Sequence, residues 1–123
     1  MPEDTRKLVV ILSRGLDDER SSVAFSIANA GLASGFEVLL FLVSSGTDWA
    51  RRGAVDLPHL NAADPSIRQF YDAFRQNGGQ IMVCPPCAKV RGYDESTLVE
   101  GVTVAGAPAM LEWVAQGART ISL

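Results

Sequence analysis

The sequence predicts an α/β protein, a three-layer α/β/α sandwich with a mostly parallel five-stranded sheet. Three observations support this prediction: short apolar runs alternate with segments of helical periodicity, the early runs are apolar at nearly every position, and glycines or prolines stand between segments. Strands that are apolar on both sides belong in a sheet covered on both faces. The alternation favours right-handed strand–helix–strand crossovers, and therefore parallel strands with helices on both faces.

The first third of the chain predicts a strand, a helix and a second strand in succession. Lys7 to Ser13 is a continuous aliphatic run, which is typical of a buried strand. Ser21 to Ser34 is rich in alanine and serine, has apolar residues near helical spacing and stops at Gly35, which predicts a helix with a small-residue face. Such a face packs closely on a sheet, and Phe36 to Val43 is the buried strand that follows.

The middle of the chain contains the clearest helical pattern. Asp64 can cap this helix, Pro65 can begin it, and Gly78-Gly79 ends it. Its apolar stripe falls at i, i+3, i+4 and i+7, that is, at Ile67, Phe70, Tyr71 and Phe74. We expect the last three, which are aromatic, in the core. A short helix around Trp49 to Arg52 is expected before it.

The last third predicts three more strands and two more helices. The strands are expected at Gln80–Cys84, Val102–Ala105 and Ala118–Leu123. A short helix follows Pro86, and a longer one lies between Pro108 and Gly117. Because no repeat, low-complexity tract or linker interrupts the pattern, we expect one domain over residues 1–123.

Composition narrows the possible partners and the compartment. A net charge of −3 and a pI near 5.0 argue against nucleic acid as a partner, because nucleic-acid binding usually requires a basic face. The first apolar run is too short for a membrane span or a signal-peptide core, so we expect no membrane association and a cytoplasmic location. In a reducing compartment, a CxxC pair indicates redox, sulfur or metal chemistry more often than a structural disulfide.

Binding residues are expected in three loops, because the crevice of such a sheet lies outside the carboxyl ends of the strands. The loops are SRGLDDER, SSGTDW and CPPCAKVRG. In the first, Arg14 is a candidate for the crevice; the loop lacks both glycine-rich phosphate motifs, so no cofactor is expected. In the second, Ser44 and Ser45 offer hydroxyls beside a flexible glycine, and Trp49 either walls a small pocket or packs in the core or an interface.

The third loop holds the two cysteines of the chain, Cys84 and Cys87, separated by two prolines. A residue before proline avoids helical geometry, so we expect Cys84 to end a strand and the helix to begin at Pro86. The free amides of residues 87–89 then favour a thiolate at Cys84, and Lys89 and Arg91 add positive charge. This pattern predicts a reactive sulfur at Cys84.

Other interpretations of these residues stay open. Cys84 is alternatively a small core residue, and Cys87 is either a resolving thiol or a bystander. A metal site is the weakest interpretation, because the usual soft donors are only the two cysteines and His59. His59 itself is more readily a surface or turn residue than a catalytic base.

These residues resemble the DsrE/DsrF-like proteins over nearly the full chain. The resemblance lies in the order of elements and in three segments: GLDDER, FLVSSGTDWARRG and GGQIMVCPPCAKVRG. Its most specific piece is the cysteine that ends the third long strand, with Arg91-Gly92 seven and eight residues on. The resemblance implies the DsrE/F-like fold with flavodoxin-like topology, and it places the acceptor cysteine of a sulfur relay at Cys84. It also implies donor and acceptor proteins as partners and a homo-oligomer, a trimer or hexamer.

Two alternatives to a persulfide relay remain at this point. Cys87 is a departure from the simplest relay members, and a second thiol that attacks a Cys84 persulfide would release sulfide and leave a disulfide. The pair would then act as a thiol-disulfide catalyst. The other alternative is a non-catalytic oligomeric module that binds a small ligand or partner, with both cysteines buried and inert.

Overall fold

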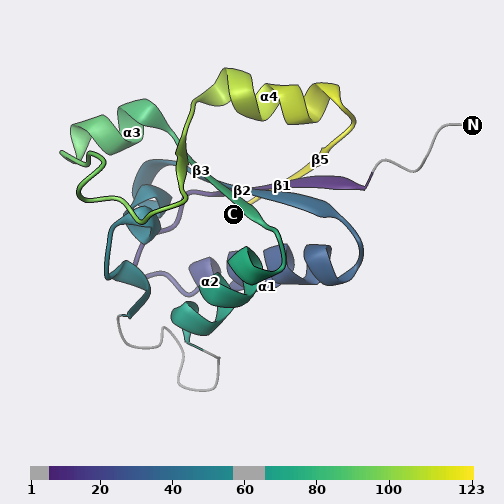
Figure 1. Cartoon of the computed structure of the whole chain (residues 1–123), viewed down its shortest axis with the longest axis horizontal. Coiled ribbons are helices and arrows are strands. Elements are labelled where there is room, and N and C mark those ends of the chain that lie inside the picture. Colours follow the sequence, from purple (N-terminus) through teal and green to yellow (C-terminus); the bar gives the residue numbers. More distant parts are fainter. Residues whose placement is uncertain (1–5, 57–65) are drawn as a thin grey trace, which may run out of the picture.

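Five parallel strands form one sheet in the order β4-β3-β2-β1-β5, with helices on both faces (Figure 1). The computed structural model describes residues 6–56 and 66–123. The elements of this part are β1 (Lys7–Leu12), α1 (Arg20–Ala33), β2 (Glu37–Leu42), the 3₁₀ helices η1 (Ser44–Ala50) and η2 (Ala54–Asp56), α2 (Ile67–Gln76), β3 (Gln80–Val83), α3 (Pro85–Val90), β4 (Thr103–Val104), α4 (Ala107–Ala115) and β5 (Arg119–Ser122).

The predicted fold class is confirmed, and the sheet is parallel throughout rather than mostly parallel. The helices α1 and α2 cover one face, α4 covers the other, and α3 lies beyond the carboxyl ends of the central strands (Figure 1). The order of strands differs from the 2-1-3-4-5 order of flavodoxin. Here the chain adds β2, β3 and β4 on one side of β1, and only β5 returns to the other side.

The core consists of two clusters, one on each face of the sheet. The larger one joins β1, β2 and β3 to α1 and α2, and α1 contributes the predicted small-residue face, with Ala24, Ala28 and Gly31 buried. The smaller one lies under α4 and contains Val9, Leu39, Phe41 and Met82 as its buried members. The two central strands are therefore apolar on both faces, as their sequences indicate.

The helix α2 begins at Ile67, and Ser66 caps it. The Ser66 hydroxyl accepts a hydrogen bond from the Gln69 N–H at 3.2 Å, and the Gln69 side chain accepts one from the Ser66 N–H at 3.0 Å. This capping box is visible in the sequence as SIRQ but was not part of the prediction; Asp64 and Pro65 lie outside the described residues. The apolar stripe faces the core as expected: Ile67, Tyr71 and Phe74 are buried, and Phe70 packs against them partly buried.

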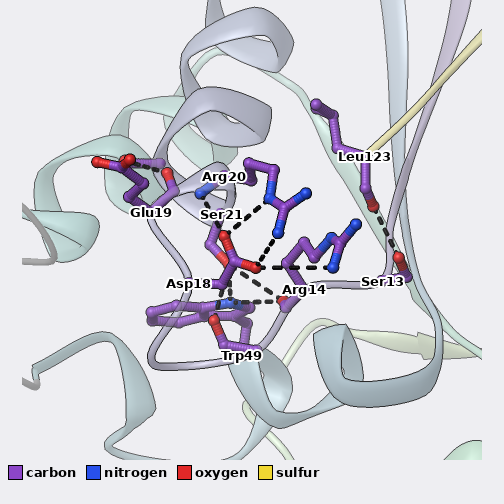
Figure 2. A network of polar contacts seen from close by, with 10 residues as sticks. Ser13, Arg14, Asp18, Glu19, Arg20, Ser21, Trp49 and Leu123 are labelled. Carbon is purple, nitrogen blue, oxygen red and sulfur yellow. Dashed lines mark hydrogen bonds and ion pairs between the residues drawn. The ribbon is translucent and has the colours of Figure 1, made fainter.

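The segment after β2 forms η1 from Ser44 to Ala50, not a short helix around residues 49–52. Trp49 fixes its position because its side chain is only 2% exposed and packs edge-on against Phe25, with 6.0 Å between ring centroids. Figure 2 shows the Trp49 indole N–H donating to the Ser21 hydroxyl at 2.9 Å and to the Arg14 carbonyl at 3.2 Å. Trp49 is thus a core residue, which is the second of the two alternatives that the sequence left open, and its side chain does not wall a binding pocket.

Gly46 holds η1 against the end of β1, so it is required for close packing rather than for flexibility. A Cβ atom at Gly46 would collide with the Leu12 backbone carbonyl. The backbone bonds of the same turn run from the Val43 N–H to the Leu12 carbonyl at 3.0 Å and from the Gly46 N–H to the Val43 carbonyl at 2.9 Å. Only glycine permits this approach of η1 to the sheet.

Gly46→Ala is expected to lower the free energy of unfolding by about 1–3 kcal/mol, because either η1 or the end of β1 must move to make room. The measurement is urea unfolding followed by circular dichroism. Ser45→Ala is the matched control; Ser45 is exposed and already carries a Cβ, so a change within about 0.5 kcal/mol is expected. Equal stability of the two variants would show that η1 does not depend on the Gly46 contact.

Candidate functional site

The three predicted loops adjoin one another at the carboxyl edge of the sheet. Gly15 of the first loop packs against Ser45 of η1, where an added Cβ would lie 3.1 Å from the Ser45 Cβ. The Ser44 N–H of η1 in turn donates to the Cys87 Sγ of α3 at 3.3 Å. The loops after β1, β2 and β3 therefore form one continuous surface around the cysteines.

Cys84 ends β3 and is the N-cap residue of α3, with extended backbone angles of φ −65° and ψ 122°. The helix begins at Pro85, one residue earlier than predicted. The first turn closes through the Ala88 N–H, which donates to the Cys84 carbonyl at 3.0 Å. Both prolines fit inside this turn because the first positions of a helix do not use their N–H groups.

Cys84 is not the low-pKa thiol that the sequence pattern indicates. Burial raises the pKa of the Cys84 thiol above its ordinary value, and the Cys87 thiol beside it adds to the rise, while the Cys87 backbone N–H opposes it only in part. The prediction relied on the amides of residues 87–89, but the Ala88 N–H is already bound to the Cys84 carbonyl. Cys84 also packs half-buried against the smaller core cluster, and it is therefore the thiol that holds its proton.

Cys87 has the lowered pKa instead. Burial alone would raise the pKa of Cys87, but four contacts together hold it below its ordinary value. They are the Ser44 N–H, the Cys84 thiol, the positive charge of Arg91 and the hydroxyl of Thr47. These contacts favour the thiolate form at Cys87 over that at Cys84.

A polar network holds Arg91 close to Cys87. The Arg91 guanidinium donates to the Cys87 carbonyl at 3.1 Å and pairs with Asp48, with 3.4 Å between Nε and Oδ1. The Tyr93 hydroxyl donates to the same Asp48 oxygen at 2.5 Å. Burial raises the pKa of Tyr93, and the hydrogen bond to the Asp48 carboxylate raises it further. The phenol therefore remains a hydrogen-bond donor.

Sequence reasoning missed three residues of this site: Thr47, Asp48 and Tyr93. Thr47 and Asp48 lie inside SSGTDW, where only the serines and the tryptophan were considered, and Tyr93 stands two residues after Arg91. A signal was available for Asp48, since a carboxylate in a loop beside a predicted basic helix is a natural partner for Arg91. No comparable signal marks Thr47, whose role depends on how η1 folds.

The other predicted binding residues take different places. Arg14 pairs with Asp18, at 3.8 Å between nitrogen and oxygen, and Asp18 is also held by Arg20 at 2.9 Å, which Figure 2 shows as one cluster. Ser44 and Ser45 are exposed, and Ser44 acts through its backbone N–H.

Lys89 is exposed and lines a separate groove of about 630 Å³ beside α3. Its charge is not among the groups that lower the pKa of Cys87, whereas that of Arg91 is. Of the two basic candidates, Arg91 is therefore the one whose charge is seen to lower the pKa of Cys87.

Within residues 6–56 and 66–123, no group of three or more histidine, cysteine or acidic side chains is arranged to hold a metal ion. His59, the remaining soft donor, lies outside these ranges. The same described part of the chain contains no helix that is long and apolar enough to cross a membrane.

A family model for the DsrE/DsrF-like family matches residues 6–123. The chain belongs to this family. The resemblance seen in the sequence is thereby confirmed. Membership supports a sulfur-relay type of protein, and the chemistry at the cysteines remains to be derived from this chain.

Relatives and solved structures give the same fold without assigning an activity. An uncharacterised protein of Methanopyrus kandleri is 27% identical over 98% of this chain and 96% of its own length, and one of Methanocaldococcus jannaschii is 26% identical over 93% and 96%. The YchN protein of E. coli superposes with a TM-score of 0.77 at 17% identity, covering 97% of this chain and 99% of YchN. MTH1491 of Methanobacterium thermoautotrophicum, a protein of unknown function, superposes with a TM-score of 0.73 at 21% identity over 98% and 100%.

Arg91→Gln is expected to raise the pKa of Cys87, because it removes the positive charge that favours the thiolate. The measurement is the rate of iodoacetamide alkylation against pH in a Cys84→Ser background, which leaves one thiol. Lys89→Gln removes an equal charge from the same helix and is expected to leave the profile unchanged. Identical shifts in both variants would mean that only the net charge of the loop matters, not the position of Arg91.

Proposed function

We propose that this protein is a persulfide carrier in which Cys87 takes up a sulfane sulfur and passes it on. The observation that supports this most directly is the pair of unlike thiols in contact: Cys87 has a lowered pKa and Cys84 has a raised one. Sulfur transfer needs one accessible thiolate that attacks and later leaves. Membership of a sulfur-relay type of family supports the same reaction class.

Each sulfur transfer breaks one S–S bond and forms another, so the reaction needs no cofactor. The Cys87 thiolate attacks the outer sulfur of a donor persulfide R–S–SH, the S–S bond of the donor breaks, and Cys87–S–SH and R–S⁻ are formed. An acceptor thiolate then attacks the outer sulfur of the Cys87 persulfide, and Cys87 leaves again as a thiolate. Donor and acceptor proteins are therefore the expected partners.

The raised pKa of Cys84 favours a carrier over a sulfide-releasing catalyst. Release would require a Cys84 thiolate to attack the inner sulfur of the Cys87 persulfide, forming a disulfide and expelling HS⁻. Burial keeps Cys84 protonated at neutral pH, which suppresses that attack. The resemblance to the family assigns the acceptor to Cys84, whereas the thiol environments here favour Cys87, and this difference is open to direct test.

Intact mass spectrometry after incubation with glutathione persulfide tests the assignment. Wild type and Cys84→Ser are expected to gain the mass of one sulfur atom, because both retain the Cys87 thiolate, while Cys87→Ser gains none. Uptake retained in Cys87→Ser but lost in Cys84→Ser would move the acceptor to Cys84. No mass gain in wild type would overturn the carrier proposal.

A second candidate function is thiol-disulfide exchange, and the contact between the two thiols favours it. The same spectra separate the two functions. A redox pair loses the mass of two hydrogens in the wild type and in neither single variant, and both substitutions damage it equally. The inert-module alternative needs both cysteines buried, whereas both are half-buried.

We also propose that the protein assembles as a homo-oligomer through α4. This helix has the sequence APAMLEWVA, with one charged residue, and none of its residues is fully buried. Leu111 is 53% exposed and Val114 is 39% exposed. An apolar helix that lies on the sheet with such side chains outward is typical of a surface covered by another subunit.

Leu111→Lys is expected to reduce the oligomer to smaller species, because a charge in an apolar interface is left without a partner. Sedimentation velocity at micromolar concentration measures the change. Val23→Lys, on α1 and 44% exposed, is the control and should leave the sedimentation coefficient unchanged. A wild-type protein that sediments as a monomer would contradict the proposal.

A further inference from the structure

Ser44 has a backbone conformation that its residue type rarely adopts. Its φ is 50°, and it is the only non-glycine residue with positive φ in the described part of the chain. Conformations of this kind persist only where the surrounding structure enforces them, and they cluster at functional sites. In this conformation the Ser44 N–H is directed at the Cys87 Sγ, at 3.3 Å, although the Ser44 side chain itself is exposed.

Thr47 adds a second donor from the same turn. Its side chain is 0% exposed, and its Oγ1 makes no hydrogen bond of standard geometry with any described residue. The hydroxyl is nevertheless among the groups that lower the pKa of the Cys87 thiol. A neutral thiol is a weak acceptor, so a hydroxyl beside it gains a full hydrogen bond only when the sulfur is charged.

We propose that the Ser44 N–H and the Thr47 hydroxyl form a two-donor pocket that binds the Cys87 sulfur as an anion. The two groups belong to η1 and lie three residues apart; the Ser44 N–H contacts the Cys87 sulfur directly, and the Thr47 hydroxyl is buried without a hydrogen bond to a described residue. A buried hydroxyl without a partner costs free energy, and this cost is removed when the sulfur becomes a thiolate. The pocket thus selects the charged form of Cys87.

The charged and titratable groups around this sulfur form a defined set. Cys84 and Arg91 belong to α3 or its cap, and Asp48 of η1 pairs with Arg91 and accepts from Tyr93. Because Asp48 is already bound by Arg91 and Tyr93, its negative charge opposes the thiolate less than a free carboxylate would. Ser44 and Thr47 carry no charge, so their effect is separable from that of Arg91.

The pocket deepens the proposed function and rests on it in one respect, namely that Cys87 must leave as a thiolate when an acceptor takes the sulfur. The same two donors that favour the resting thiolate stabilise this leaving group as the S–S bond breaks. Ser44 and Thr47 are therefore positioning residues, which act on sulfur transfer through Cys87.

The test is the pH profile of iodoacetamide alkylation in the Cys84→Ser background, which requires no sulfur donor. Thr47→Val is isosteric and is expected to shift the profile to higher pH and to slow the reaction at pH 7 by about two- to threefold, because the smaller thiolate fraction outweighs the greater nucleophilicity of the thiolate. Thr47→Ser keeps the hydroxyl and is expected to restore the profile. Thr120→Val, the same substitution at an exposed threonine of β5, is the matched control and is expected to leave the profile unchanged.

A merely structural role for Thr47 predicts the opposite pattern, in which Thr47→Val changes the melting temperature while the alkylation profile stays in place; that result would overturn the pocket. If Thr47→Val does not fold, Thr47→Ala against Thr47→Ser provides the same comparison. If the variant without the hydroxyl takes up sulfur normally and its alkylation profile is unchanged, the pocket proposal is wrong and the carrier proposal stands. If the profile shifts in the Thr47 variant but the wild-type protein takes up no sulfur, the pocket proposal stands and the carrier proposal is wrong.

Discussion

The hydrogen bond from the Ser44 N–H to the Cys87 sulfur is the contact on which the site depends. It joins two short segments, η1 after β2 and α3 after β3, that lie far apart in the sequence. Each segment is fixed from elsewhere: Trp49 anchors η1 in the core, and the Ala88 N–H closes the first turn of α3 on the Cys84 carbonyl. The sulfur is therefore held between two rigid supports rather than on a free loop.

This arrangement gives the two cysteines opposite properties although they share one motif. Cys84 lies at the strand end, where burial disfavours its thiolate, and Cys87 lies one helical turn later, where donors from η1 reach it. The two prolines produce the separation, since they fit the first helical turn and leave Cys84 extended. The motif therefore places one thiol where its thiolate is favoured and the other where its proton is retained.

Most of the fold follows from local patterns in the sequence. The apolar runs at Lys7–Ser13 and Phe36–Val43 and the stripe from Ile67 to Phe74 predict the central strands and α2, because burial of both faces or of one helical face leaves a direct periodic signal. The strand order is not available in this way. It depends on the direction in which each crossover moves, and the return of β5 to the far side of β1 involves contacts between the two ends of the chain.

The site is less predictable than the fold because it, like the strand order, depends on contacts between segments that lie far apart in the sequence. The sequence indicates that the cysteine loop lies at the carboxyl edge, but the acidity of each thiol depends on groups that only tertiary structure brings near it. Gly46 illustrates this: its closeness to the Leu12 carbonyl sets the path of η1, and that path directs the Ser44 N–H at the Cys87 sulfur. A glycine that packs against β1 thus helps determine the environment of a cysteine on another loop.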